Sequence, residues 1–166
     1  NDYLYENAEI TEPGGLWTIW TKPTASPQYY PLVFTSFWVE PRLWGMNDEG
    51  LFIARGFHIT NVILHGLGAV MFWLVLRRLK VPGAWLAACI FAAHPVMSES
   101  VAWISERKNV LAGVFYFSSV LAYLTFSPLE EESIGRGRRW GWYFVSLLCF
   151  ALALASKSIT CTLPAA

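Results

Sequence analysis

The residues most able to do chemistry lie in one segment, between His94 and Arg107. An imidazole, two carboxylates and a guanidinium occur there, on His94, Glu99, Glu106 and Arg107. If this segment is one helix, Glu99, Trp103 and Glu106 fall on one stripe, and Arg107 follows one turn after Trp103. Such a set could bind a phosphate and a hydroxyl-bearing substrate. A helix at the level of the lipid headgroups, with its charges facing water, explains the spacing equally well.

A second polar set lies inside an apolar run upstream. His58, Asn61 and His65 are spaced i, i+3 and i+7, which places them on one face of a helix. They could line a polar cavity, or they could join helices through hydrogen bonds. Because such bonds are common between membrane helices, the spacing favours the structural role over catalysis.

Two single charges and three thiols complete the inventory. Lys157 separates two apolar runs, so its ammonium either reaches the membrane interface or meets an anion there, and the residue alone favours the first. Asp2 is one carboxylate in a polar opening segment. Cys89, Cys149 and Cys161 lack ligand spacing, so neither a zinc site nor a disulfide framework is expected. The net charge of +0 excludes a basic field for nucleic acid.

The composition decides the class of protein. The 166 residues are 55% hydrophobic and 14% charged, with a mean hydropathy of +0.39, whereas soluble domains are about a quarter charged. Aromatic residues make up 16% of the chain, and aromatic rings collect at membrane interfaces. These values predict an all-α integral membrane protein.

Four apolar runs predict about four membrane helices in a polytopic bundle: Leu51–Leu76, Ala84–Ala93, Asn109–Phe126 and Trp140–Ala155. Prolines and glycines break residues 1–50, which we interpret as a first extracytoplasmic loop with short helices. Within this loop, Tyr29–Trp44 fits an amphipathic helix lying in the interface. Residues 51–166 then form the transmembrane helix bundle. Both ends of the chain look cut, which predicts a larger parent protein.

The positions of the basic residues predict the topology. The connections around 77–80 and 136–139 hold six of the twelve basic residues, and the first fifty positions hold only Lys22 and Arg42. By the positive-inside rule both connections face the cytoplasm. The first loop, the segment His94–Lys108 and the residue Lys157 should then all reach the opposite face.

Several strings resemble the polytopic glycosyltransferases of the C-type fold (GT-C), in particular the bacterial relatives of the transmembrane O-mannosyltransferases that carry tetratricopeptide repeats. The resemblance covers nearly the whole chain and is most specific in the His-Pro…Glu…Ala-Trp…Arg run. The strings are Gln28-Tyr29-Tyr30-Pro31-Leu32, Phe57-His58-Ile59-Thr60-Asn61 with Leu64-His65, Phe91-Ala92-Ala93-His94-Pro95, Glu99-Ser100-Val101-Ala102-Trp103-Ile104 with Arg107, and Ser156-Lys157 with Leu163-Pro164.

The resemblance implies that a mannose-like sugar on a polyprenyl phosphate is transferred to an acceptor hydroxyl on a protein. It places the general base on an acid of the first loop, and Asp2 occupies that place; the family often has two consecutive acids there, and here Asn1 precedes Asp2. Arg107 and Lys157 are the candidates for binding the donor phosphate. The pocket candidates are His94, Glu99, Glu106, His58, Asn61 and His65. Neither a metal nor a cofactor is expected.

The expected location is a bacterial inner membrane with the site facing the periplasm, or the lumenal face of the endoplasmic reticulum in a eukaryote. Tetratricopeptide repeats, with a period of about 34 residues, are expected only outside this sequence. A non-catalytic membrane scaffold with partner-binding repeats remains the alternative function. A transporter ranks last, because no internal repeat is visible.

Overall fold

Every regular element in the described part of the chain is a helix, apart from one isolated bridge between Met46 and Phe52. The structure is a computed structural model that describes residues 10, 12, 14–23, 28–46, 52–128 and 136–165, without the side chains of 136–139 and 165. The described elements are α3 (Gly15–Thr21), α4 (Pro31–Trp44), α5 (Ala54–Arg78), α6 (Ala84–Ala93), α7 (Pro95–Ala102), η1 (Ile104–Glu106), α8 (Arg107–Phe126), α9 (Arg136–Ser156) and η2 (Ser158–Ala165).

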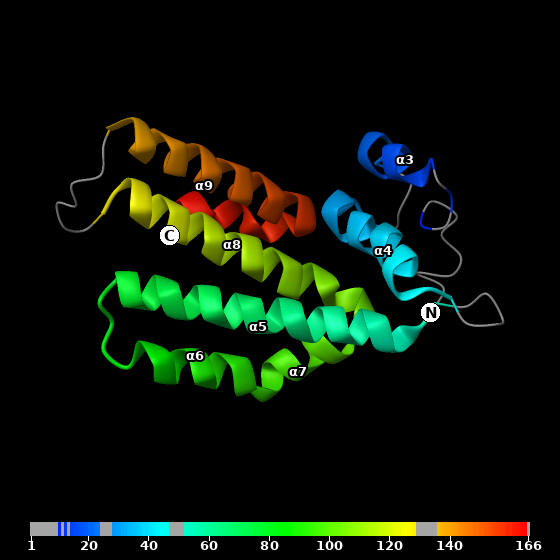
Figure 1. Cartoon of the computed structure of the whole chain (residues 1–166), viewed down its shortest axis with the longest axis horizontal. Coiled ribbons are helices and arrows are strands. Elements are labelled where there is room, and N and C mark those ends of the chain that lie inside the picture. The colour runs from blue at the N-terminus through cyan, green and yellow to red at the C-terminus, as the bar shows by residue number, and fades with distance from the viewer. Residues whose placement is uncertain are drawn as a thin grey trace.

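The long helices form a bundle in which α8 packs between α5 and α9, while α6 packs against α5 (Figure 1). Small side chains allow these close approaches: Gly68 of α5 faces Val114 of α8, and Ala122 of α8 is buried. Ser119 of α8 and Ser146 of α9 are both buried, and each hydroxyl lies 2.9 Å from the other residue's carbonyl oxygen. The all-α bundle predicted from composition is confirmed.

Two helical segments are long and apolar enough to cross a membrane by themselves: Ala54–Arg78 and Ile104–Phe126. Only 22% and 28% of the most apolar windows of these segments are buried within the described structure, so most residues of these windows are at least partly exposed. A third span is possible if α6 and α7 form one bent unit. The described apolar part of α9, Trp140–Ser156, is shorter. The four predicted runs all form helices.

The bend between α6 and α7 measures 55° and has a local cause. Pro95 disfavours the helical conformation for the residue before it, and His94 is extended, with φ −67° and ψ 128°. The His94 Nδ1 then accepts the Val96 backbone N–H at 3.2 Å, which caps the start of α7. The histidine therefore acts as an N-cap.

A second interruption lies at Trp103, which is extended between α7 and η1. The single helix on which the predicted stripe depends is therefore broken. Asn61 of α5 stabilises the break, because its side-chain amide donates to the carbonyl oxygens of Val101 at 3.1 Å and Trp103 at 3.3 Å. Glu99 is exposed, Glu106 is half-buried and Arg107 is buried, so these charges do not share one surface.

The helix predicted at Tyr29–Trp44 forms as α4, and α3 and α4 lie at one end of the bundle (Figure 1). The basic connection after α5 and the start of α9 lie at the other end (Figure 1). Exposed tryptophans occur on elements at both ends: Trp85 at the start of α6 and Trp140 near the start of α9, and, on the elements of the opposite end, Trp17 in α3, Trp44 at the end of α4 and Trp103 between α7 and η1. This distribution is typical of the two aromatic belts of a membrane protein.

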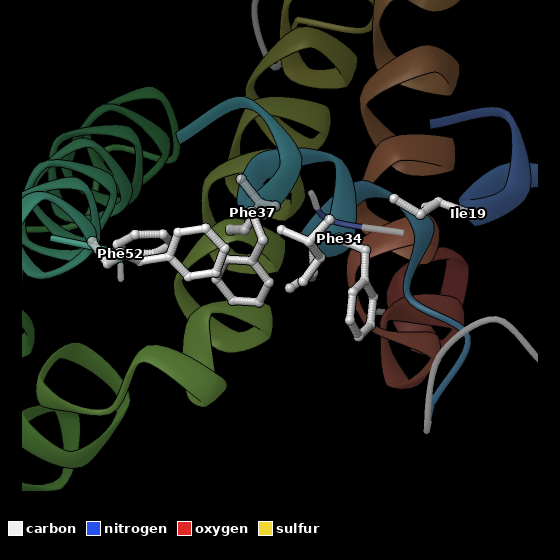
Figure 2. Close-up of a cluster of buried hydrophobic side chains, with 8 residues drawn as sticks. Ile19, Phe34, Phe37 and Phe52 are labelled. Carbon is white, nitrogen blue, oxygen red and sulfur yellow. The ribbon is translucent and has the colours of Figure 1, made fainter. Parts of the chain in front are cut away.

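A cluster of buried apolar side chains attaches α4 to the bundle (Figure 2). Phe34 and Phe37 of α4 lie between Ile19 and Phe52. The rings of Phe34 and Phe37 meet edge to face, with centroids 6.1 Å apart, a favourable arrangement. The cluster fixes α4 above the starts of α5 and α8.

Candidate functional site

Lys157 lies at the turn between α9 and η2, and its ammonium reaches across to α8. The ammonium donates to Asn109 Oδ1 at 2.5 Å. The Asn109 amide nitrogen in turn donates to Glu106 Oε2 at 2.8 Å and to Ser100 Oγ at 3.0 Å. Glu106 also pairs with Lys108 at 3.1 Å. The network thus joins α7, η1 and α8 to the turn between α9 and η2, and it brings Lys157 close to the segment from His94 to Arg107.

This network borders a cavity of about 370 Å³. Residues of α5, α6, α7, α8 and η2 line it. Its polar lining residues are His65, Ser100, Asn109, Tyr116, Lys157 and Thr160. A lysine ammonium with hydroxyl, amide and imidazole groups around it can bind an anion that carries hydroxyl groups. That chemistry suits a phosphorylated sugar.

A second cavity, of about 680 Å³, lies next to the first. Tyr116 and Phe117 line both cavities. The second is mainly apolar, with Phe72 and Leu76 of α5 and Leu147 of α9 among its lining residues. Both cavities are lined mainly by apolar groups and they meet at the middle of α8, but the first also has the Lys157 ammonium and the His65 imidazole in its lining.

Arg107 has a different environment from Lys157. Its side chain is 0% exposed and forms an ion pair with Glu40 of α4. It also donates to Asn61 Oδ1 and to the Phe57 carbonyl oxygen, each at 2.8 Å, and its guanidinium lies 4.9 Å from the Phe37 ring centroid. The phosphate-binding role of Arg107 stays a prediction. In this structure its guanidinium is occupied by groups of the protein.

Glu40 is buried with Arg107. Burial raises the pKa of the Glu40 carboxyl above its ordinary value, and the neighbouring Arg107 guanidinium opposes the shift. An ion pair away from water holds its partners in place, because removing either would leave a buried charge alone. The pair therefore joins α4 to the start of α8.

The remaining predicted residues fall into two groups. Asn61 is fully buried and makes the interhelical hydrogen bonds that the structural alternative expects, and His65 Nε2 lies 3.0 Å from the Ala92 carbonyl oxygen beside the cavity at Lys157. His58, His94 and Glu99 are exposed. Asp2 lies outside the described residues, so its predicted role as a base remains a prediction.

Sequence reasoning missed Glu40 and Asn109. Glu40 follows three apolar residues and precedes a proline inside a mainly apolar helix, a context in which a carboxylate is normally paired. Asn109 opens an apolar run three residues after Glu106. The spacing therefore indicates a contact between Asn109 and Glu106, but nothing in the local sequence indicates Lys157 as the third partner.

Together the helices and the cavities define an all-α, membrane-type bundle, and the chain is an integral membrane protein. It is similar to human protein O-mannosyl-transferase TMTC2, with 30% identity over 142 residues that cover 84% of the chain and 16% of the relative. Human protein O-mannosyl-transferase TMTC4 is 28% identical over 187 residues, covering 94% of the chain and 24% of the relative. Drosophila melanogaster protein O-mannosyl-transferase Tmtc2 is 32% identical over 115 residues, covering 68% of the chain and 12% of the relative.

These relatives are much longer than the chain, which spans about 16% of the human TMTC2 protein. No family model matches the sequence. No solved structure matches it. The likeness thus connects the chain to proteins named as transferases of mannose to protein.

Proposed function

We propose that the chain forms part of a membrane glycosyltransferase that moves a mannose-like sugar from a polyprenyl-phosphate donor to a hydroxyl of a protein acceptor. The observation that carries this proposal is the Lys157 ammonium in the lining of a cavity that adjoins a second, larger and mainly apolar cavity. The names of the relatives, protein O-mannosyl-transferases, support the sugar and the acceptor.

The two cavities support the choice of donor. A polyprenyl-phosphate sugar has an anionic head and a long apolar chain. The cavity at Lys157 offers a cation and hydroxyl groups, and the neighbouring cavity offers Phe72, Leu76 and Leu147. Burial of apolar chain in the second cavity stabilises binding, while the ammonium orients the phosphate.

In the proposed reaction Asp2 accepts the proton of the acceptor hydroxyl. The hydroxyl oxygen bonds to the anomeric carbon of the sugar as the bond from that carbon to the phosphate oxygen breaks. The phosphate leaves with an added negative charge, which Lys157 stabilises. We assign this contact to Lys157 rather than Arg107, because Glu40 already occupies the Arg107 guanidinium. His65, Glu106, His94 and Glu99 remain the proposed pocket residues.

We place the reaction on the extracytoplasmic face, opposite the basic connections at 77–80 and 136–139. This face is the periplasmic side of a bacterial inner membrane, or the lumenal side of the endoplasmic reticulum in a eukaryotic cell. Tetratricopeptide repeats elsewhere in the protein would bind partners. The chain itself would then supply part of a GT-C-like domain.

The experiment that tests the proposal is Asp2→Asn in the full-length protein, reconstituted in vesicles with polyprenyl-phosphate mannose and an acceptor protein. We expect mannose transfer to be lost while membrane insertion is unchanged, because the amide cannot accept the proton. Glu12→Gln is the matched control, since Glu12 is an exposed acid of the same segment. Transfer at the wild-type rate by Asp2→Asn would remove Asp2 from the mechanism.

A scaffold is the second candidate, and one observation favours it. Trp17 and Leu43 are 77% and 72% exposed on α3 and α4, as expected for residues that contact a partner or a membrane surface. Titration of the full-length protein with labelled polyprenyl-phosphate mannose separates the two functions. Saturable binding supports the transferase, and an absence of binding supports the scaffold.

A further inference from the structure

We propose that Asn109 is a positioning residue that holds the Lys157 ammonium, with its charge available, at the place where the donor phosphate binds. This inference rests on the proposed function and assigns Asn109 and Glu106 a part in it. The starting observation is the 2.5 Å hydrogen bond from the Lys157 ammonium to Asn109 Oδ1.

The orientation of the Asn109 amide is fixed from both ends. Its nitrogen donates to Glu106 Oε2 and Ser100 Oγ, at 2.8 Å and 3.0 Å, which uses both N–H groups. Its oxygen accepts from Lys157. Rotation of the amide by 180° would place the oxygen against the Glu106 carboxylate and the nitrogen against an ammonium. The network therefore permits only the observed orientation.

The Asn109 amide also lies between the Glu106 carboxylate and the Lys157 ammonium, which would otherwise neutralise each other. Glu106 pairs with Lys108 at 3.1 Å, and no carboxylate among the described residues forms an ion pair with Lys157. Glu106 thus polarises the amide, and the amide oxygen attracts the ammonium. One hydrogen bond of the Lys157 ammonium goes to Asn109, which leaves two N–H donors for an anion in the cavity.

Asn109 decides where the ammonium lies. A lysine side chain is flexible, and here only its backbone is otherwise anchored: the Lys157 N–H donates to the Ala153 carbonyl oxygen at 2.9 Å, and its own carbonyl accepts the Thr160 hydroxyl at 2.8 Å. Among the described residues the ammonium makes its hydrogen bond to Asn109. Without that acceptor the side chain would leave the cavity border.

The test exchanges the amide and the carboxylate in the double variant Asn109→Asp with Glu106→Gln. The new amide at position 106 can donate to the new carboxylate at position 109, Ser100 can rotate its hydroxyl to donate, and the net charge is conserved. Lys157 would now contact a carboxylate that neutralises it. We expect the KM for polyprenyl-phosphate mannose to rise about 10- to 100-fold, the effect of losing one hydrogen bond to a charged group. We expect kcat to fall as well, because the neutralised ammonium stabilises the leaving phosphate less, while the melting temperature stays near its wild-type value.

Two further single variants complete the design, and every variant is measured in the full-length protein in vesicles. Lys157→Gln should raise KM similarly, and combining it with the exchange should add little, because both remove the same contact. Lys80→Gln removes a lysine at the opposite end of the bundle and should leave KM unchanged. Binding of polyprenyl phosphate without a sugar should likewise weaken in the exchange variant and in Lys157→Gln, and it should stay unchanged in Lys80→Gln.

The outcomes separate the two proposals. An exchange variant with wild-type KM, in a protein that transfers mannose, overturns the positioning role and leaves the transferase in place. A wild-type protein that neither binds polyprenyl phosphate nor transfers mannose overturns both. If Asn109→Ala lowers stability while the exchange variant keeps both stability and KM, the amide is only structural.

Discussion

Glu40 on α4 and Arg107 on α8 form an ion pair in which neither side chain is more than 4% exposed. The same guanidinium binds the Asn61 side chain and the Phe57 carbonyl oxygen of α5. One arginine thus joins three helices at the end of the bundle that holds α4. The structure of this end depends on that side chain.

Replacing Glu40 should destabilise the protein strongly. Glu40→Gln leaves the Arg107 charge buried without its partner, and we expect a loss of about 3–5 kcal/mol in the free energy of unfolding. Replacing both residues, as Glu40→Leu with Arg107→Met, should cost less than the two single changes together. Chemical unfolding in detergent measures both. Strictly additive losses would contradict the coupling.

Asn61→Leu should loosen the segment around Trp103. Without the Asn61 amide the carbonyl oxygens of Val101 and Trp103 lose their side-chain donor, and we expect a loss of about 1–3 kcal/mol. Hydrogen exchange of residues 100–106 should become faster. Val62→Ala is the control, because Val62 is the exposed neighbour. Equal exchange in both variants would show that the break does not depend on Asn61.

Gly56→Ala should disturb the contact between α5 and the end of α4. A Cβ at position 56 would lie 2.4 Å from Trp44 Cγ and 2.8 Å from Trp44 Cβ, so the helices must shift, at a cost of about 1–3 kcal/mol. Gly66→Ala on the same helix meets no atom within 4 Å and should stabilise it by about 1 kcal/mol. Thermal unfolding distinguishes the two, and equal shifts would rule out the contact.

Ser119 and Ser146 should be coupled across α8 and α9. Each hydroxyl donates to the other residue's carbonyl oxygen at 2.9 Å. Ser119→Ala and Ser146→Ala should each lower the free energy of unfolding by about 0.6–1.7 kcal/mol, the range for such bonds in membranes, and a double-mutant cycle isolates the 3.2 Å contact between the two hydroxyl oxygens. Ser158, which is exposed, supplies a control as Ser158→Ala. No loss from either single change would mean that the two bonds do not stabilise the bundle.

Local signals predicted the helices well. The run Ala84–Ala93 forms α6 with those bounds, because Gly83 begins it with a positive φ of 75° and Pro95 ends it. The apolar runs likewise form α5, α8 and α9, since hydrophobic length is a local property. The interruption at Trp103 was not predicted, because a residue from another helix, Asn61, stabilises it.

The site was harder to predict than the helices. Lys157 and the segment from His94 to Arg107 were expected near each other from topology alone, and Lys157 does contact Asn109. Arg107 was also expected to bind the donor phosphate, but its ion pair with Glu40 was not predicted, because an ion pair between helices that are distant in the sequence leaves no periodic pattern. Which charge is neutralised and which stays available depends on packing in three dimensions.

The exposed tryptophans near both ends of the bundle have a consequence for the depth of Lys157. Indole rings prefer the boundary between water and hydrocarbon, so rings at two levels oppose any vertical displacement of the protein in either direction. In a thinner or thicker bilayer we expect the lipid to adjust around these rings. The ammonium would then stay at a constant depth from the surface from which a protein acceptor approaches.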